Sequence, residues 1–229
     1  MAFTRTLVAA AVVAACTAPA ASAATISWAD WTNASAGIVG GTLSVGMTSV
    51  GVTYTGPYSF AQTSGGTNYW IPNSPYLSGT VSNGPGDSGN SDIIGLSAAG
   101  THTISFSSTV HNPLIALVSF NGANITFAPG SNLNYLSSGC GYWGCGSFGS
   151  PTSTSFTGNG ELHGVVQLQG DFDSISFSNT FPENWHGITV GVEGLAVTAV
   201  PEPETYAMML AGLGLLGFAA RRRKKAGAA

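Results

Sequence analysis

Between Ala24 and Val200, no stretch of the sequence repeats its apolar residues with the helical period of about 3.6 residues. Short alternating or β-branched runs occur instead, separated by Gly, Ser, Asn and Pro. Such runs are typical of strands bounded by turns. We therefore expect an all-β domain over residues 24–199, a jelly-roll-like β-sandwich of two antiparallel sheets. A β-helix is the main alternative, although the sequence has no fixed internal repeat.

Individual runs lead to more specific expectations. The continuously apolar run Leu114–Val118 predicts a central strand buried on both faces, and Ile104 and Phe106 alternate as in a half-buried strand. Between Leu43 and Tyr54 the apolar residues change parity, which predicts a bulge or bend near Thr48-Ser49.

Residues 162–178 have the pattern of a β-hairpin. Gly170-Asp171 between two apolar runs suits a type II′ turn, because glycine tolerates the positive φ of its first position. This register pairs Val166 with Ile175, and we expect both side chains, together with Phe177, to face the core.

The charge distribution excludes whole classes of ligand. The segment from Ala24 to Val200 has no Lys or Arg but holds eight of the ten acidic residues, so its formal net charge is −8 with histidines neutral. Its acidic residues are Asp30, Asp87, Asp92, Glu161, Asp171, Asp173, Glu183 and Glu193. A surface without basic side chains cannot neutralise phosphates, so we expect no nucleic-acid partner.

The N-terminus has the three parts of a secretory signal peptide. Arg5 precedes the apolar run Leu7–Ala15, and Ala21-Ser22-Ala23 fits the rule for signal-peptidase cleavage. Residues 1–23 are therefore the predicted signal peptide, with Ala24 as the first mature residue. The competing interpretation is a bacterial lipobox ending in Cys16, which would become the lipidated first residue.

The C-terminus has three parts of its own. Residues 200–205 contain Pro201-Glu202-Pro203, residues 206–220 are apolar, and residues 221–225 are all basic. As a helix the apolar part would be about 22 Å long, short of a hydrocarbon core of about 30 Å. Bilayer thinning or snorkelling of the flanking basic residues would close the gap, so we expect a transmembrane helix with a cytoplasmic basic cluster. That cluster consists of Arg221, Arg222, Arg223, Lys224 and Lys225.

This tail resembles the PEP-CTERM sorting signal of Gram-negative bacteria, a segment also labelled the ice-binding-protein C-terminal domain. The resemblance covers roughly the last 30 residues and rests on Pro201-Glu202-Pro203, the glycine-rich apolar segment and the basic end. It implies recognition by a membrane-embedded exosortase, cleavage near the Pro-Glu-Pro motif, and delivery to the cell surface or exopolysaccharide matrix. It transfers no catalytic residue to the preceding domain.

Two long loops are predicted, at Gly56–Asp92 and Ser131–Phe156, and both carry candidate binding residues. Cys140 and Cys145 are expected to form a disulfide in the oxidising exterior, holding the intervening aromatic pair on a rigid tip. The candidates for stacking on a sugar are Tyr69, Trp70, Tyr142 and Trp143. The alternative is that these rings cover the core.

A calcium site is a further candidate. Asp87, Asn90 and Asp92 offer three oxygen ligands within six residues, and calcium prefers such ligands. Their spacing is not that of an EF-hand. Asp and Asn also occur in turns because their side chains bond to nearby backbone.

The sequence gives little support for catalysis. It contains no Gly-x-Ser-x-Gly or His-Glu-x-x-His motif, and the four histidines are scattered. Glu161 and His163 would share the outward face of one strand. We expect a structural or adhesive surface protein without catalytic activity. The alternatives are a carbohydrate-binding module for exopolysaccharide and a glycoside hydrolase that uses a carboxylate pair.

Overall fold

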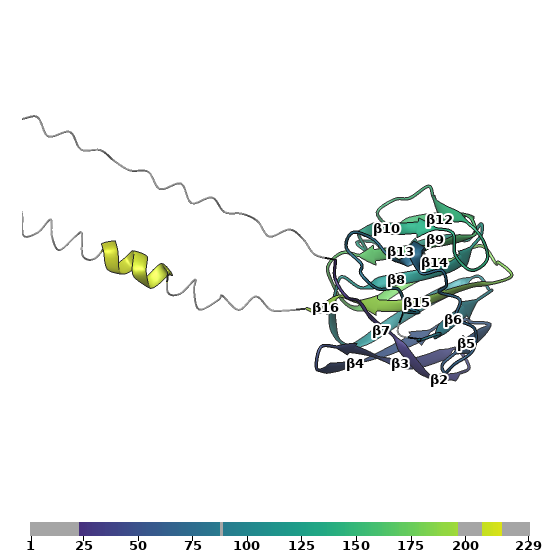
Figure 1. The fold of residues 1–229 in the computed structure, drawn as a ribbon, viewed down its shortest axis with the longest axis horizontal. Helices are drawn as coiled ribbons and strands as arrows, with labels where there is room; N and C mark the ends of the chain where they lie inside the picture. The colour runs from purple at the N-terminus through teal and green to yellow at the C-terminus, as the bar shows by residue number, and fades with distance from the viewer. Residues whose placement is uncertain (1–22, 88, 197–207, 217–229) are drawn as a thin grey trace, which may run out of the picture. The chain divides into compact units, whose positions relative to one another are not determined.

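The computed structural model describes residues 23–87, 89–196 and 208–216 (Figure 1). The chain divides into two compact units, Met1–Leu195 and Ala196–Ala229. In the first unit the described residues form two antiparallel sheets of seven and nine strands, which confirms the all-β sandwich.

Each sheet combines strands from distant parts of the chain. The seven-stranded sheet runs β10 (Leu133–Gly139), β13 (Leu162–Leu168), β8 (Leu114–Phe120), β15 (His186–Val192), β6 (Ile93–Leu96), β5 (Phe60–Gln62), with β1 (Ser27–Trp28) paired to β15. The nine-stranded sheet runs β11 (Gly146–Gly149), β12 (Ser155–Gly160), β9 (Asn124–Phe127), β14 (Asp171–Asn179), β7 (Gly100–His111), β4 (Thr48–Thr55), β3 (Ile38–Val45), β2 (Asp30–Ser35), with β16 (Gly194–Leu195) paired to β7.

Strand β8 shows why the seven-stranded sheet is buried on both faces. All seven of its residues are buried, as the run of apolar residues predicted. Ile115 and Leu117 belong to the main core, to which both sheets contribute, whereas Leu114, Ala116 and Val118 belong to a second apolar cluster. Because successive side chains of a strand point to opposite faces, this second cluster lies on the outer face of the sheet.

The second cluster is completed by segments outside the central strands. Trp70 and Tyr76 come from the Gly56–Asp92 segment, where η1 (Ser74–Tyr76) is a single 3-10 turn, and Ile26 comes from the start of the domain. This long segment is therefore mostly loop, as expected, but it serves as an apolar cover for the sheet.

The predicted hairpin at residues 162–178 is wrong in its pairing. Strand β13 pairs with β10 and β8, whereas β14 pairs with β7 and β9 in the other sheet. The connection bonds to other segments: the Gln169 amide donates to Asn132 O, and the Gly170 amide donates to Asn112 Oδ1. The predicted core residues Val166, Ile175 and Phe177 are all buried, because alternation decides burial whichever strand is the neighbour.

The parity change between Leu43 and Tyr54 comes from a hairpin, not from the predicted bulge. Strands β3 and β4 pair across the two-residue turn Gly46-Met47, with Val45 opposite Thr48. Gly46 has φ +59°, which suits the first turn position of a type II′ hairpin. Because the turn has two residues, the buried side chains have odd residue numbers in β3 and even residue numbers in β4.

The second predicted loop, Ser131–Phe156, is also largely wrong, because it contains β10 and β11. Its glycine- and serine-rich sequence conceals strands whose side chains are mostly half-buried.

In the second unit, residues 208–216 are helical. No helix of the described residues is long and apolar enough to cross a membrane. The predicted signal peptide and lipobox, the Pro-Glu-Pro motif, the basic cluster and the ends of the predicted transmembrane helix lie outside the described residues.

Candidate functional site

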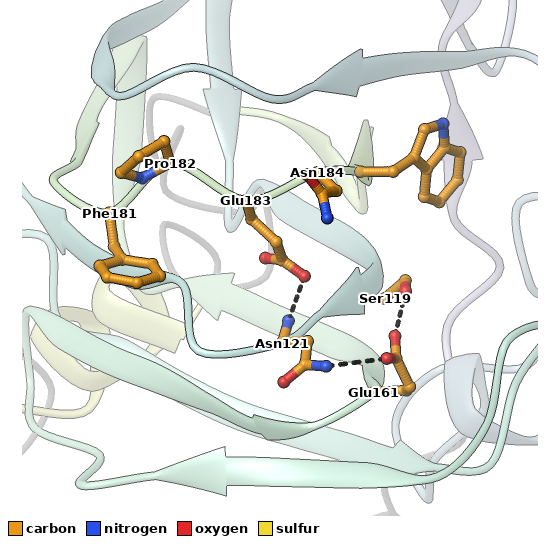
Figure 2. A pocket seen from close by; sticks show the side chains of 8 residues that line it. Ser119, Asn121, Glu161, Phe181, Pro182, Glu183 and Asn184 are labelled. Atoms are coloured by element: carbon orange, nitrogen blue, oxygen red, sulfur yellow. Dashed lines mark hydrogen bonds between the residues drawn. The ribbon is translucent and has the colours of Figure 1, made fainter.

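A pocket of about 400 Å³, here called the acidic pocket, opens where three connections of the sandwich meet (Figure 2). Ser119 comes from the end of β8, Asn121 from the connection to β9, and Glu161 from the residue between β12 and β13. The β14–β15 connection supplies the remaining lining residues, Phe181, Pro182, Glu183, Asn184 and Trp185.

A β-bulge positions Ser119. Phe120 pairs with Leu162 and Leu117 pairs with Gly164, so β8 has one more residue than β13 between these two pairs. Ser119 has φ +58°, a left-handed conformation that is uncommon for a residue other than glycine. Bulges re-aim side chains and occur next to functional sites. Here the Ser119 hydroxyl donates a hydrogen bond to Glu161 Oε2.

Asn121 holds both carboxylates of the pocket. Its backbone amide donates to Glu183 Oε1 at 2.7 Å, and its side-chain Nδ2 donates to Glu161 Oε1 at 2.9 Å. Figure 2 shows the two acidic side chains converging on this one asparagine. A single residue, Asn121, therefore holds both carboxyl groups in place, although Glu161 and Glu183 lie 22 positions apart in the sequence.

The two carboxyl groups differ in environment. Burial raises the pKa of Glu183 to about 7, the amide of Asn121 opposes the rise, and the charge of Glu161 adds to it. Behind Glu183 lies His186, with Nδ1 at 3.3 Å from Oε2. Burial, with a smaller contribution from His102, lowers the pKa of His186 to about 4. At neutral pH this imidazole is uncharged, so it does not neutralise the pocket.

Aromatic rings form a wall beside the acidic pocket. The aromatic wall consists of Tyr69, Tyr142, Trp143 and Trp185. Ring centroids are 4.9 Å apart for Tyr69 and Trp185, 5.0 Å for Tyr142 and Trp143, and 6.0 Å for Trp143 and Trp185. A second pocket of about 260 Å³, lined by Ser119, Trp143, Glu161 and Trp185, joins this wall to the acidic side chains.

The predicted disulfide between Cys140 and Cys145 is present in the structure. The amide of Gly141 donates to the carbonyl of Gly144 at 2.8 Å, which closes the short loop. Its two aromatic residues are exposed, Tyr142 by 44% and Trp143 by 54%. The loop therefore presents a tethered aromatic tip and does not bury it in the core.

Trp70, predicted as an exposed stacking residue, is fully buried and cannot contact a ligand. Its indole Nε1 donates to the Asp92 carbonyl at 3.2 Å, and its ring packs on Tyr76 with centroids 5.3 Å apart. The outer face of the seven-stranded sheet is apolar and needs a cover, which Trp70 provides. Its neighbour Tyr69 does join the aromatic wall.

The three predicted calcium ligands all make hydrogen bonds within the protein, and two of them bond to each other, since the Asp92 amide donates to Asn90 Oδ1 at 2.8 Å. Asp87 accepts hydrogen bonds from the Gly84 amide and from Asn73 Nδ2, as expected for a turn residue. Asp92 Oδ2 accepts from the Trp31 amide. The Nδ2 of Asn90 donates to the carbonyl of Ala29. Across residues 23–87, 89–196 and 208–216, no group of three or more His, Cys, Asp or Glu could hold a metal ion. Oxygen atoms of Asp87, Asn90 and Asp92 thus accept hydrogen bonds from backbone amides, and the calcium site stays a prediction.

Glu161 and His163 do not act together. Glu161 lines the acidic pocket, whereas His163 is fully buried, with Nδ1 at 3.1 Å from the Tyr76 hydroxyl. Sequence reasoning missed Ser119 and Asn121, and it counted Trp185 among aromatic residues expected mostly to pack in the core. The segment of residues 181–185, in which a glutamate and an asparagine precede a tryptophan at its end, was the one signal that could have pointed to this site.

Comparison with known proteins identifies the tail. Residues 199–224 match the family model described as the PEP-CTERM protein-sorting motif, which confirms the resemblance drawn from the sequence. The chain is therefore an exported protein that passes through the membrane, is processed by an exosortase and reaches the cell surface. No curated protein and no solved structure matches the chain.

Proposed function

We propose that this protein is an adhesive component of the surface or exopolysaccharide matrix of a Gram-negative bacterium, and that its sandwich domain binds extracellular polysaccharide. Binding, without catalysis, is the role that we assign to the domain. The proposal accounts both for the export of the protein and for the two features of its site, the aromatic wall and the acidic pocket.

The exposed, tethered pair Tyr142-Trp143 carries the proposal. Sugar rings have apolar faces that stack on aromatic side chains, and a rigid aromatic ring loses little conformational entropy when it binds. Beside these rings, Glu161, Asn121 and Ser119 supply the fixed polar atoms that sugar hydroxyls need for orientation. Polysaccharide chains are long, so repeated weak contacts of this kind produce adhesion.

The test is binding to a panel of immobilised polysaccharides, using the purified exported protein. Replacing Trp143 by alanine is expected to remove most of the binding, because it removes the exposed platform. Met47→Ala is the matched control, since Met47 is fully exposed at the β3–β4 turn, away from the residues of both pockets. Equal binding by Trp143→Ala and wild type would refute the proposal.

A glycoside hydrolase is the second candidate, favoured by the two carboxyl groups in one pocket. Glu183, protonated up to about pH 7, would donate its proton to the glycosidic oxygen as the bond to the anomeric carbon breaks. Glu161 would take a proton from the water that attacks that carbon. Mass spectrometry of a bound oligosaccharide after prolonged incubation distinguishes the two candidates. Shortened products that form with the wild type and are absent with Glu161→Gln and Glu183→Gln would show that the domain is a hydrolase and would overturn the proposal of binding without catalysis.

A further inference from the structure

The smaller pocket, which joins the aromatic wall to Glu161, is lined by an unusual combination of side chains. A carboxylate, that of Glu161, and two indole rings, those of Trp143 and Trp185, line the same pocket, with Ser119 completing the lining. The two indoles meet edge to face, at an angle of 68°. Indole faces attract cations through their negative electrostatic potential, and tryptophan does so best among the aromatic residues.

Among the described residues of the sandwich domain, no Lys or Arg balances the charge of Glu161. Its two hydrogen-bond donors, Ser119 and Asn121, are both neutral. Residues 24–200 contain no Lys or Arg, and the histidines that lie beside a carboxyl group are His111, next to Asp171, and His186, next to Glu183. These donors fix the carboxylate in direction, so a cation that enters the pocket finds a preformed partner.

We infer that this pocket binds a protonated primary amine, and that the polysaccharide bound by the protein contains amino sugars with free amines. The inference rests on the proposed function and names its ligand class. The sugar ring stacks on the aromatic wall while its ammonium group bonds to Glu161 and faces the indoles of Trp143 and Trp185. An N-acetylated sugar lacks this charge, and an acidic sugar is repelled by Glu161 and by the acidic domain around it.

The test compares two oligosaccharides of equal length, one of glucosamine and one of N-acetylglucosamine, titrated calorimetrically into the exported protein at pH 6 and 0.15 M salt. The glucosamine oligomer is expected to bind about tenfold more tightly, the effect of one charge-assisted contact with cation–π support. Raising the pH to 9 deprotonates the amine and should abolish this preference.

Glu161→Gln keeps the shape of the side chain and removes its charge. It is expected to lose the tenfold preference for the glucosamine oligomer over the acetylated one, because the ammonium group then has no charged partner. Asp173→Asn is the matched control: it removes one exposed acidic charge from β14, outside both pockets, and should keep the preference. Thermal unfolding of both variants shows that they are folded, and the ligand comparison on wild type needs no variant.

The outcomes separate the two proposals. Equal or tighter binding of the acetylated oligomer overturns the amine pocket but leaves polysaccharide binding standing. A lysine homopolymer that binds as tightly as the glucosamine oligomer would show that charge alone is recognised, and would also overturn the inference. If neither oligomer binds and the polysaccharide panel is negative, the proposed function itself fails.

Discussion

The contrast between Trp70 and Trp143 leads to a prediction about stability. The same substitution, tryptophan to alanine, removes a fully buried ring at Trp70 and a ring that is 54% exposed at Trp143. We expect Trp70→Ala to destabilise the domain strongly and Trp143→Ala to affect mainly ligand binding.

The magnitudes follow from burial. Replacing a buried tryptophan by alanine costs about 3–5 kcal/mol, because apolar contacts are lost and a cavity remains. The lost hydrogen bond to the Asp92 carbonyl belongs to this penalty. For a domain of this size, each kcal/mol shifts Tm by about 2–4 °C, so Tm should fall by about 6–20 °C. Trp143 is half exposed and loses only its contacts within the aromatic wall, edge to face with Tyr142 and Trp185 and stacked with Tyr69, which together are expected to cost about 1–2 kcal/mol.

The assay is calorimetric unfolding of both variants beside the wild type, with polysaccharide binding measured on the same preparations below their Tm. Trp70→Phe retains most of the ring and should recover more than half of the loss. The reasoning is refuted if Trp70→Ala unfolds within about 2 °C of the wild type, or if Trp143→Ala is the less stable of the two.

Three more predictions concern pH, the disulfide and processing. Burial lowers the pKa of His102, His163 and His186 to about 4, so the unfolded chain binds more protons between pH 6.5 and 4 and stability falls as pH falls through that window. Glu183 and Asp92 oppose this because burial raises their pKa, but the three histidines outnumber these two carboxyl groups, so urea unfolding should show a net loss of stability near pH 5.5. Constant stability from pH 7 to 5 would contradict this prediction. Reducing the Cys140–Cys145 bond should cost at most about 2 kcal/mol by loop entropy yet weaken polysaccharide binding, and unchanged binding by fully reduced protein would count against the tethered tip. Intact mass of native protein should show a chain that starts at Ala24 and ends near Glu202, whereas a lipidated Cys16 start or an uncut Ala229 end would contradict the predicted processing.

Much of the fold could be predicted because strand burial is a local property. The alternation in β7 and the apolar run in β8 are visible within a few residues, and both were interpreted correctly. Pairing is not local. A short turn at Gly170-Asp171 is compatible with a hairpin, but from β6 to β10 and again from β12 to β16 each strand is followed by one in the other sheet. The competing partners are distant in sequence, so no local pattern could reveal them.

The candidate site illustrates a second limit. The tethered tip was predictable, because two cysteines with four residues between them, in an exported chain, define it. Whether a given tryptophan is exposed was not predictable. Trp70 lies in a polar loop but packs on the outer face of a sheet, and only the three-dimensional structure shows that this face needs a cover. The pairing of Glu161 with Glu183 depends on Asn121 and on a bulge at Ser119, and three separate connections meet there.

The central claim is that polysaccharide binds against Trp143 and Trp185. The chain has five tryptophans, and their indole N–H groups give separate signals in an NMR spectrum of the ¹⁵N-labelled protein. The indoles of Trp28, Trp31 and Trp70 donate to acceptors within the domain. On titration with a glucosamine oligomer, the account predicts that the signals of Trp143 and Trp185 shift while those of Trp31 and Trp70 stay fixed. Unchanged signals for Trp143 and Trp185 under saturating ligand would contradict it.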